Sequence, residues 1–192
     1  LLAHLFPGTH AALEEGDELS LRLIEQTMSN TDKRIRADKT VTPAFLYAAL
    51  LWPAMLREKA RLLQAMPEAA AYAQAAQQAV TQQLQRTSIP KRFSIPMREI
   101  WDLQMRLPQR AGLRAVRLLD HPRFRAAYDF LLMREDAGEQ LDGLGSWWTR
   151  FQSATEDERE EMIKTLNRRE PGNKPRRRRR SPTRKKPMAP QE

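Results

Sequence analysis

The sequence predicts an all-α protein, with a compact helical body followed by a disordered, arginine- and proline-rich C-terminal arm. Glycine is scarce, with 7 residues in 192, and no stretch alternates apolar and polar residues as a strand does. Apolar residues recur three or four positions apart, which places them on one face of a helix. From Arg168 onward, 11 residues are basic and two are acidic. We therefore expect the body over residues 1–167 and the arm over residues 168–192.

The first clear helical pattern runs from Leu19 to Ser29. Leu19, Leu23 and Ile24 fall on one face of this helix, which is the face expected to enter the core. Asp17 is placed to cap the helix, because a short carboxylate accepts hydrogen bonds from the free N–H groups of the first turn.

The central core helix is expected from Ala44 to Met55, because its residues are apolar on nearly all sides. Thr42 is suited to the N-cap and Pro43 to the first helical position, where its missing N–H costs nothing. Pro53 is expected to kink or end the helix, because it removes a backbone donor.

A third helix is expected from Pro67 to Arg86, with a narrow apolar stripe and a half-exposed position. The stripe consists of Tyr72, Ala76, Val80 and Leu84. These helices form a predicted subdomain of residues 1–87, part of the body.

Residues 88–167 form a second, basic helical subdomain. Its first part, residues 88–96, contains two prolines and reads as a loop that leads into a helix ending near Leu107. Pro108 and Gly112 bracket a break, and a short helix follows over Leu113 to Leu119.

The rest of this subdomain consists of three more predicted helices. One starts after His121 and Pro122, where the imidazole is better placed for capping than for catalysis. A short one begins at the Trp147–Trp148 pair, and the acidic stretch at residues 156–161 is compatible with the last. The paired tryptophans could stack on nucleic-acid bases, but they are expected to fill the core. The predicted core contains Phe45, Leu46, Leu50, Trp101, Leu103, Phe124, Tyr128 and Leu131.

Charge is distributed unevenly within the body. Residues 1–167 carry 22 charges of each sign, whereas residues 86–125 hold 10 basic and three acidic residues. If Pro108 bends the chain without reversing it, Arg106, Arg110, Arg114 and Arg117 form one helical ridge; the alternative is an ordinary solvated face. The folded residues expected to bind nucleic acid are Lys91, Arg92, Arg98, Arg106, Arg110, Arg114, Arg117, Arg123 and Arg125.

The arm is expected to bind single-stranded RNA of any sequence; the alternative is a solubilising tail or a localisation patch. A flexible polycation binds polyanions by releasing their counterions, and arginine both forks onto phosphate and stacks on bases. The arm has no aromatic or aliphatic anchor, so we expect no membrane partner. Its predicted contact residues are Arg176, Arg177, Arg178, Arg179, Arg180, Arg184, Lys185 and Lys186.

No catalytic or metal-binding constellation is predicted. The sequence has no cysteine, three scattered histidines, no glycine-rich phosphate loop and no Asp-x-Asp pair. Asp102, Asp120 and Asp129 are single carboxylates near arginines, which suits surface ion pairs better than acid–base catalysis. Taken alone, the residues favour an RNA-binding module, and a cytoplasmic location is expected because cysteine, a signal peptide and a membrane span are lacking.

Several segments resemble the C-terminal portion of bacterial poly(A) polymerases, which belong with the CCA-adding enzymes to the class II nucleotidyltransferases. These segments occur in order along the chain, and the tail is also similar. They are Asn30-Thr31-Asp32-Lys33-Arg34-Ile35, Val41-Thr42-Pro43-Ala44-Phe45-Leu46, Ile89-Pro90-Lys91-Arg92, Ile100-Trp101-Asp102-Leu103-Gln104 and His121-Pro122-Arg123-Phe124-Arg125-Ala126-Ala127-Tyr128-Asp129.

The resemblance implies that the parent enzyme adds AMP from ATP to RNA 3′ ends with magnesium. The family's catalytic head is N-terminal and has no counterpart here, so this chain alone is expected to be inactive and to hold no cofactor. Because the chain begins with Leu1, we expect it to be part of a longer protein. Expected partners are single-stranded RNA 3′ ends, the catalytic head and RNA-decay machinery. Two alternatives stay open: a non-enzymatic RNA-binding adaptor and the body of a tRNA CCA-adding enzyme.

Overall fold

The computed structural model describes residues 1–169, with side chains described as far as Leu166, and this part of the chain is helical without a strand. The predicted all-α class is confirmed. The predicted disordered arm lies outside the described residues, except that the last helix includes Arg168 and Arg169. The helices are α1 (Leu2–Leu5), α2 (Pro7–Glu14), α3 (Glu18–Arg36), α4 (Pro43–Leu62), α5 (Glu68–Leu84), α6 (Lys91–Arg106), α7 (Leu113–Leu119), α8 (Phe124–Asp136), α9 (Leu144–Ser153) and α10 (Glu156–Arg169).

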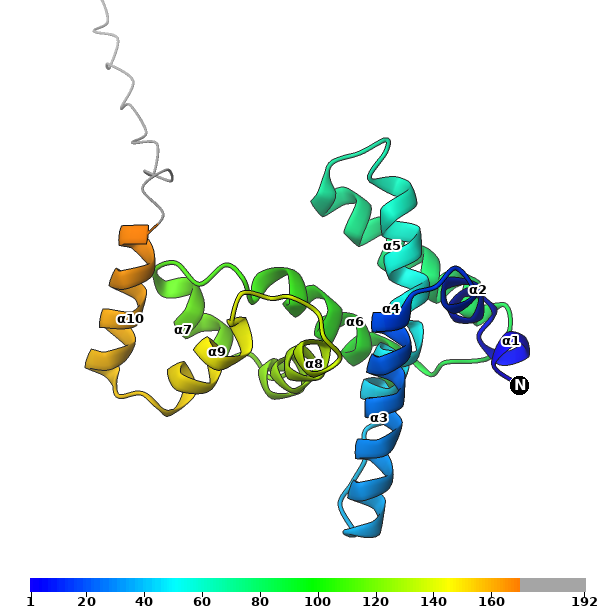
Figure 1. The fold of residues 1–192 in the computed structure, drawn as a ribbon, viewed down its shortest axis with the longest axis horizontal. Helices are drawn as coiled ribbons and strands as arrows, with labels where there is room; N and C mark the ends of the chain where they lie inside the picture. Colours follow the sequence, from blue (N-terminus) through cyan, green and yellow to red (C-terminus); the bar gives the residue numbers. More distant parts are fainter. Residues whose placement is uncertain (170–192) are drawn as a thin grey trace, which may run out of the picture.

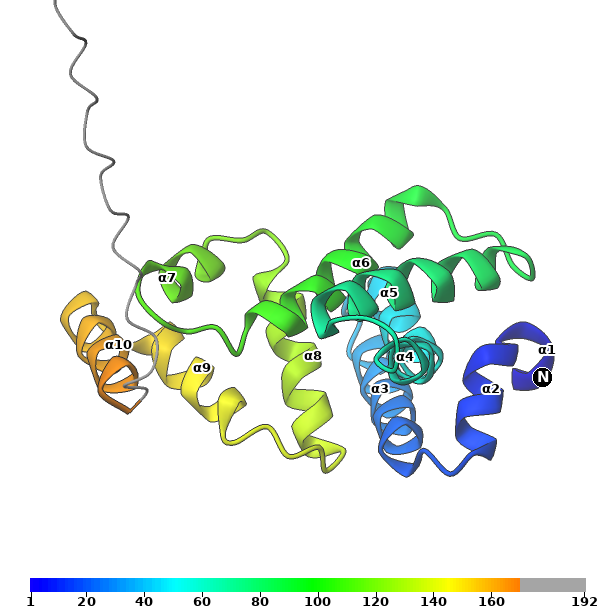
Figure 2. The same cartoon turned by 90° about the horizontal axis from the view of Figure 1, so that it is seen from above.

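Helix α4 is the centre of the larger half of the molecule. It packs against α2, α3, α5 and α6, and α6 leads from this half toward α7, α9 and α10 at the other end (Figure 1 and Figure 2). None of the helices in the described range is long and apolar enough to cross a membrane.

The first core lies around α4 and α5, and small side chains dominate their contact. Ala48 and Ala75 are fully buried there, so the two helix backbones approach closely. Trp101 of α6 closes this core by donating its indole N–H to the carbonyl of Ala48 at 3.1 Å. The buried hydroxyl of Tyr72 donates to the carbonyl of Trp101 at 2.6 Å, so every polar group that these rings bring inside has a partner.

The second core lies between α6, α7, α8 and α9, and aromatic rings fill it. Trp148 and Phe151 are fully buried, and their rings meet edge to face with centroids 5.6 Å apart. The indole N–H of Trp148 donates to the carbonyl of Leu107 at 3.1 Å, just beyond the end of α6. This bond ties α9 to the connection between α6 and α7.

Helices α6 and α8 contribute to both cores. Trp101 of α6 and Phe130 of α8 belong to the first core. Leu103 of α6 and Leu131 of α8 belong to the second. The predicted boundary after residue 87, between the two helical subdomains, stays a prediction.

One internal proline does not have the effect expected of it, and the other lies where a loop was expected. Of the two alternatives for Pro53, the end of the helix is not observed, because α4 continues to Leu62. Pro53 removes the helical donor of the Ala49 carbonyl, and the neighbouring carbonyls accept from outside the helix: that of Ala48 from the Trp101 indole N–H, and that of Leu50 from the Thr9 hydroxyl at 2.5 Å. Pro96 lies inside α6, which already begins at Lys91, so the predicted loop is shorter than expected.

The predicted caps and core are partly confirmed. Asp17 caps α3 by accepting from the backbone N–H of Ser20 at 3.0 Å, and Pro43 occupies the first turn of α4. Of the predicted core residues, Trp101, Leu103, Phe124, Tyr128 and Leu131 are buried. The other three, Phe45, Leu46 and Leu50, are only half-buried, and Leu19 is exposed. The face of α4 was misjudged because this helix is apolar on nearly every side, so its spacing did not single out Ala48, Leu51, Trp52 and Met55.

Candidate nucleic-acid interface

The exposed face of α6 carries a row of cations. Lys91, Arg98 and Arg106 are seven and eight positions apart, so they fall on one side of the helix. All three side chains are exposed, and a helix of 16 residues is about 24 Å long at ~1.5 Å per residue. This row is therefore an extended track and not a compact pocket, a shape that suits a phosphate backbone.

One carboxylate interrupts this row. Asp102 lies between Arg98 and Arg106, one helical turn from each. Packing around its carboxyl group raises the pKa of Asp102 above its ordinary value, although Arg98 and Arg106 act in the opposite direction. The negative charge of Asp102 weakens the attraction of the track for phosphate, and Asp102 forms no ion pair with either arginine.

The predicted continuous helical ridge from Arg106 to Arg117 is not formed. Helix α6 ends at Arg106 and α7 begins at Leu113, after Gly112 with a φ of +60°. A left-handed residue interrupts the helical path, so the spacing of four cannot be carried across the break. Arg114 and Arg117 still share α7, three positions apart, and both are exposed. Within residues 1–166, neither is part of an ion pair.

Two of the predicted contact residues pair with acids. Arg123, just before α8, bonds to Glu99 of α6 at 3.0 Å, and Arg125 bonds to Asp129 one turn later at 3.1 Å. These pairs are exposed and weak, so RNA phosphates can compete with the carboxylates. The His121 ring accepts from the Arg123 N–H at 3.1 Å in the turn before α8, but the N-cap of α8 is Arg123 and no side chain caps this helix, so the expected capping role of His121 is not observed.

Two further arginines lie over aromatic rings. The Arg92 guanidinium is 4.9 Å from the Phe93 ring centre, and that of Arg110 is 5.0 Å from the Trp147 ring centre. Arg110 is half-buried. The nine predicted folded contacts therefore lie on α6, on the α6–α7 connection, on α7 and at the start of α8, and we call them the basic surface.

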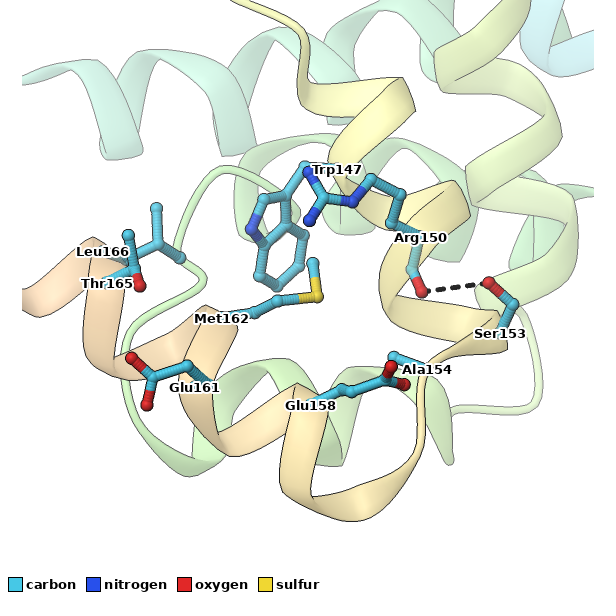
Figure 3. A pocket seen from close by; sticks show the side chains of 9 residues that line it. All are labelled: Trp147, Arg150, Ser153, Ala154, Glu158, Glu161, Met162, Thr165 and Leu166. Atoms are coloured by element: carbon cyan, nitrogen blue, oxygen red, sulfur yellow. Dashed lines mark hydrogen bonds between the residues drawn. The ribbon is translucent and has the colours of Figure 1, made fainter.

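The Trp147–Trp148 pair is not an open stacking platform. Trp148 is fully buried, as expected. Trp147 is half-buried and stacks on Phe151 with ring centres 4.6 Å apart, while Arg110 lies over its ring. Its ring forms one wall of a groove between α9 and α10, facing Met162 (Figure 3).

The groove beside Trp147 is ill suited to phosphate. Its volume is about 660 Å³, and its rim includes Glu158 and Glu161. Hydrogen bonds from the backbone N–H and hydroxyl of Thr155 lower the pKa of Glu158, which keeps it anionic. These two glutamates outnumber Arg150, the one cation in the lining, so the groove is a poor site for phosphate.

The acidic and histidine side chains of the described residues are scattered. Among them, no three histidine or acidic side chains are grouped so that they could hold a metal ion. Asp129 makes an exposed ion pair, as its sequence context suggested. The described residues thus offer positively charged surface for binding a polyanion.

One group of cations was missed by the sequence interpretation. Lys33, Arg34, Arg36 and Lys39 lie at the end of α3, which projects from the body. Basic and acidic residues are almost equal in number over residues 1–85, so a charge count over that whole range did not show this local excess. The signal that could have found it is a charge count over short windows.

Known proteins match this chain over most of its length. Residues 64–185 match the family described as "Polymerase A arginine-rich C-terminus". The chain is 38% identical to proteins named Poly(A) polymerase I of Escherichia coli O157:H7 and Salmonella typhimurium, and 33% identical to that of Haemophilus influenzae. Each comparison covers 97% of this chain but only 41–42% of the relative.

The chain thus spans about two fifths of the length of these relatives. The matched range contains every residue of the basic surface and seven of the eight predicted contact residues of the arm. The chain belongs to the bacterial poly(A) polymerase family and contains that family's arginine-rich C-terminal region.

Proposed function

We propose that this chain is the RNA-binding part of a poly(A) polymerase that adds AMP from ATP to RNA 3′ ends. The observation that carries the proposal is that a single family match, residues 64–185, joins the basic surface to the arginine-rich arm. One region of the protein thus combines a folded cationic track with a polycationic segment. Both features favour a ligand with regularly spaced negative charge.

The physical form of the surface supports RNA of any sequence. Its cations are spread along α6 and α7 instead of converging on one point, so they match a backbone and not a single phosphate group. Base-specific readout needs polar side chains held in fixed geometry against base edges. Long exposed arginine and lysine side chains do not provide that, and an enzyme acting on many transcripts does not need it.

The chemistry of AMP transfer belongs, in this proposal, to a part of the protein that this chain does not contain. Magnesium and ATP would be bound there, and the described residues would hold the RNA near that catalytic head. Cytoplasmic RNA 3′ ends are the proposed substrates, and RNA-decay enzymes are the proposed partners of the arm. The adaptor and tRNA-enzyme alternatives gain no support from the relatives, which are named poly(A) polymerases.

The test is a salt titration of RNA binding. Fluorescence anisotropy with a labelled single-stranded oligoadenylate gives the slope of log K against log salt for the full chain. If about eight arm residues contact phosphates, the contribution of the arm to the slope is expected near −5 to −6, because each contact on a single strand contributes about −0.7. A full-length variant with glutamine at the eight predicted arm positions should lose most of this slope.

Two outcomes would contradict the proposal. An unchanged slope after arm neutralisation would remove the arm from the interface, and the absence of RNA binding at low salt would remove the function. A separate incubation of the chain with ATP, magnesium and RNA tests whether it adds AMP. Elongation by protein free of host polymerase would show that the chain carries its own catalytic site.

A further inference from the structure

The C-terminal end of α3 projects from the body, as its lower end in Figure 1 shows. Only the first half of this helix enters the core, at Ser20, Leu23 and Thr27. Every residue from Asp32 to Thr40 is exposed. We call residues 32–40 the α3 tip, and the function proposed above makes no use of it.

The α3 tip concentrates positive charge. Lys33, Arg34, Arg36 and Lys39 face only two acids, Asp32 and Asp38, within the segment. Within residues 1–166, none of these four cations forms an ion pair, whereas some exposed arginines, such as Arg57, pair with glutamates. The helix dipole accounts for cations in the last turn of α3, but not for Lys39 beyond its end.

The tip is also a formed structure. The Arg34 guanidinium donates to the carbonyl of Thr40 from Nε at 3.2 Å and from Nη2 at 2.9 Å. The backbone N–H of Lys39 donates to the Arg34 carbonyl at 2.8 Å, and Asp38 takes the left-handed conformation that this turn requires. Arg34 therefore fixes the turn and leaves Lys33, Arg36 and Lys39 to face solvent.

We propose that the α3 tip is a second RNA contact, separate from the basic surface on α6 to α8. Lys33, Arg36 and Lys39 bind phosphates of a single strand, and Ile35, which is 59% exposed, lies against a base or ribose. Charge complementarity selects a polyanion, and the fixed turn reduces the entropy lost on binding. This inference rests on the proposed RNA-binding function.

The first test removes the charge without disturbing the turn. The full chain with Lys33→Gln, Arg36→Gln and Lys39→Gln keeps Arg34. Three lost phosphate contacts should make the salt slope less negative by about 2 and lower the affinity for single-stranded oligoadenylate roughly tenfold or more at low salt. The matched control carries Arg22→Gln, Arg61→Gln and Lys164→Gln, which remove the same charge from local ion pairs with Glu18, Glu58 and Glu160.

The control is expected to change the slope by much less, and circular dichroism melts of both variants check that the fold is intact. Equal losses in the two variants would show a simple net-charge effect and would overturn the proposal. An unchanged slope in the tip variant would also overturn the proposal, and an acidic protein would then be the expected partner of the tip. If the unmodified chain binds no RNA, the proposed function itself fails, whereas binding with an insensitive tip rejects this inference alone.

The second test locates the RNA directly. Because the chain has no cysteine, Ile35→Cys gives one attachment point for a benzophenone photocrosslinker at the tip. Leu63→Cys is the matched control: Leu63 is 44% exposed and follows the far end of α4, a helix about 30 Å long at ~1.5 Å per residue. RNA should crosslink at position 35 several-fold more than at position 63. Equal yields at the two positions would contradict a contact at the tip.

Discussion

The two cores of the molecule are built from different materials. Around α4 and α5, alanines such as Ala48 and Ala75 let two long helices pack closely. Around α7, α8 and α9, large rings such as Phe124, Trp148 and Phe151 fill the space between shorter helices. The contact of α4 with α5 depends on the fit of two backbones, although Trp52, Trp101 and Phe130 fill other parts of the first core, whereas the second core depends mainly on the volume of a few large side chains.

This difference bears on where the cations can lie. Helix α7 has only 7 residues and α9 has 10, so much of this end consists of helix termini and connections that face water. Arginines occupy these edges and lie over the rings beneath them, as Arg110 does over Trp147 and Arg125 over Tyr128. The helix ends and connections of the aromatic end therefore offer positions for exposed arginines, which the contact between the two long, tightly packed helices does not.

The largest expected effect is at the centre of the aromatic core. Trp148→Ala should lower the free energy of unfolding by about 3–5 kcal/mol, because it leaves a cavity and removes the hydrogen bond to the Leu107 carbonyl. Urea melts followed by circular dichroism measure the change.

Trp147→Ala is the comparison for this experiment, because Trp147 is only half-buried beside the fully buried Trp148. Its loss should cost clearly less. A similar loss of unfolding free energy in the two variants would mean that Trp147, at the groove, contributes as much to stability as Trp148 inside the core.

The contact between α4 and α5, where alanines dominate, should be destabilised by added side-chain volume and not by lost volume. Ala75→Leu adds volume where no space exists, since Ala75 is fully buried, and should cost about 1–3 kcal/mol. Ala73→Leu, on the exposed side of the same helix, is the control and should be nearly neutral. Thermal melts that show no difference between the two variants would indicate that α4 and α5 can move apart without loss.

The exposed pair on α7 tests whether the aromatic end binds RNA. Arg114→Gln with Arg117→Gln should make the salt slope for single-stranded RNA less negative by about 1.4 if both residues contact phosphate. Anisotropy titrations of the full chain provide the measurement. A slope equal to that of the unmodified chain would mean that α7 presents an ordinary solvated face.

The sequence was a better guide to the elements than to their faces. Helix existence followed from apolar spacing, and the Asp17 cap and the short helix over Leu113–Leu119 followed from local chemistry. Pro96 was read as part of a loop because proline removes a donor, yet it lies in the second turn of α6. The buried face of α4 could not be predicted, since packing partners and not spacing select among apolar residues on all sides.

The candidate site was predicted as residue types and not as geometry. The basic segment was visible as a charge excess, but its assumed ridge depended on whether Pro108 bends or ends a helix, which sequence alone does not determine. The pairing of Arg123 with Glu99, 24 positions away, is tertiary and was equally inaccessible. The α3 tip was hidden because acids elsewhere in residues 1–85 balance its charge.

The smallest expected effect concerns Asp102, the single acid within the cationic track of α6. Because its pKa is raised in the folded state, the charged form is disfavoured there. The cost to stability is present above the folded pKa and absent below the ordinary aspartate pKa of about 3.9. Asp102→Asn should therefore stabilise the protein slightly at neutral pH, by less than about 1 kcal/mol for a surface charge, and the gain should vanish in acid. The same change should tighten RNA binding modestly, because Arg98 and Arg106 then face phosphate without a competing carboxylate. Urea melts at neutral and acidic pH, paired with anisotropy titrations, measure both effects. A loss of stability at neutral pH that vanishes in acid would show instead that Asp102 is held in its charged form by its arginine neighbours and that the α6 track is already neutralised at its centre.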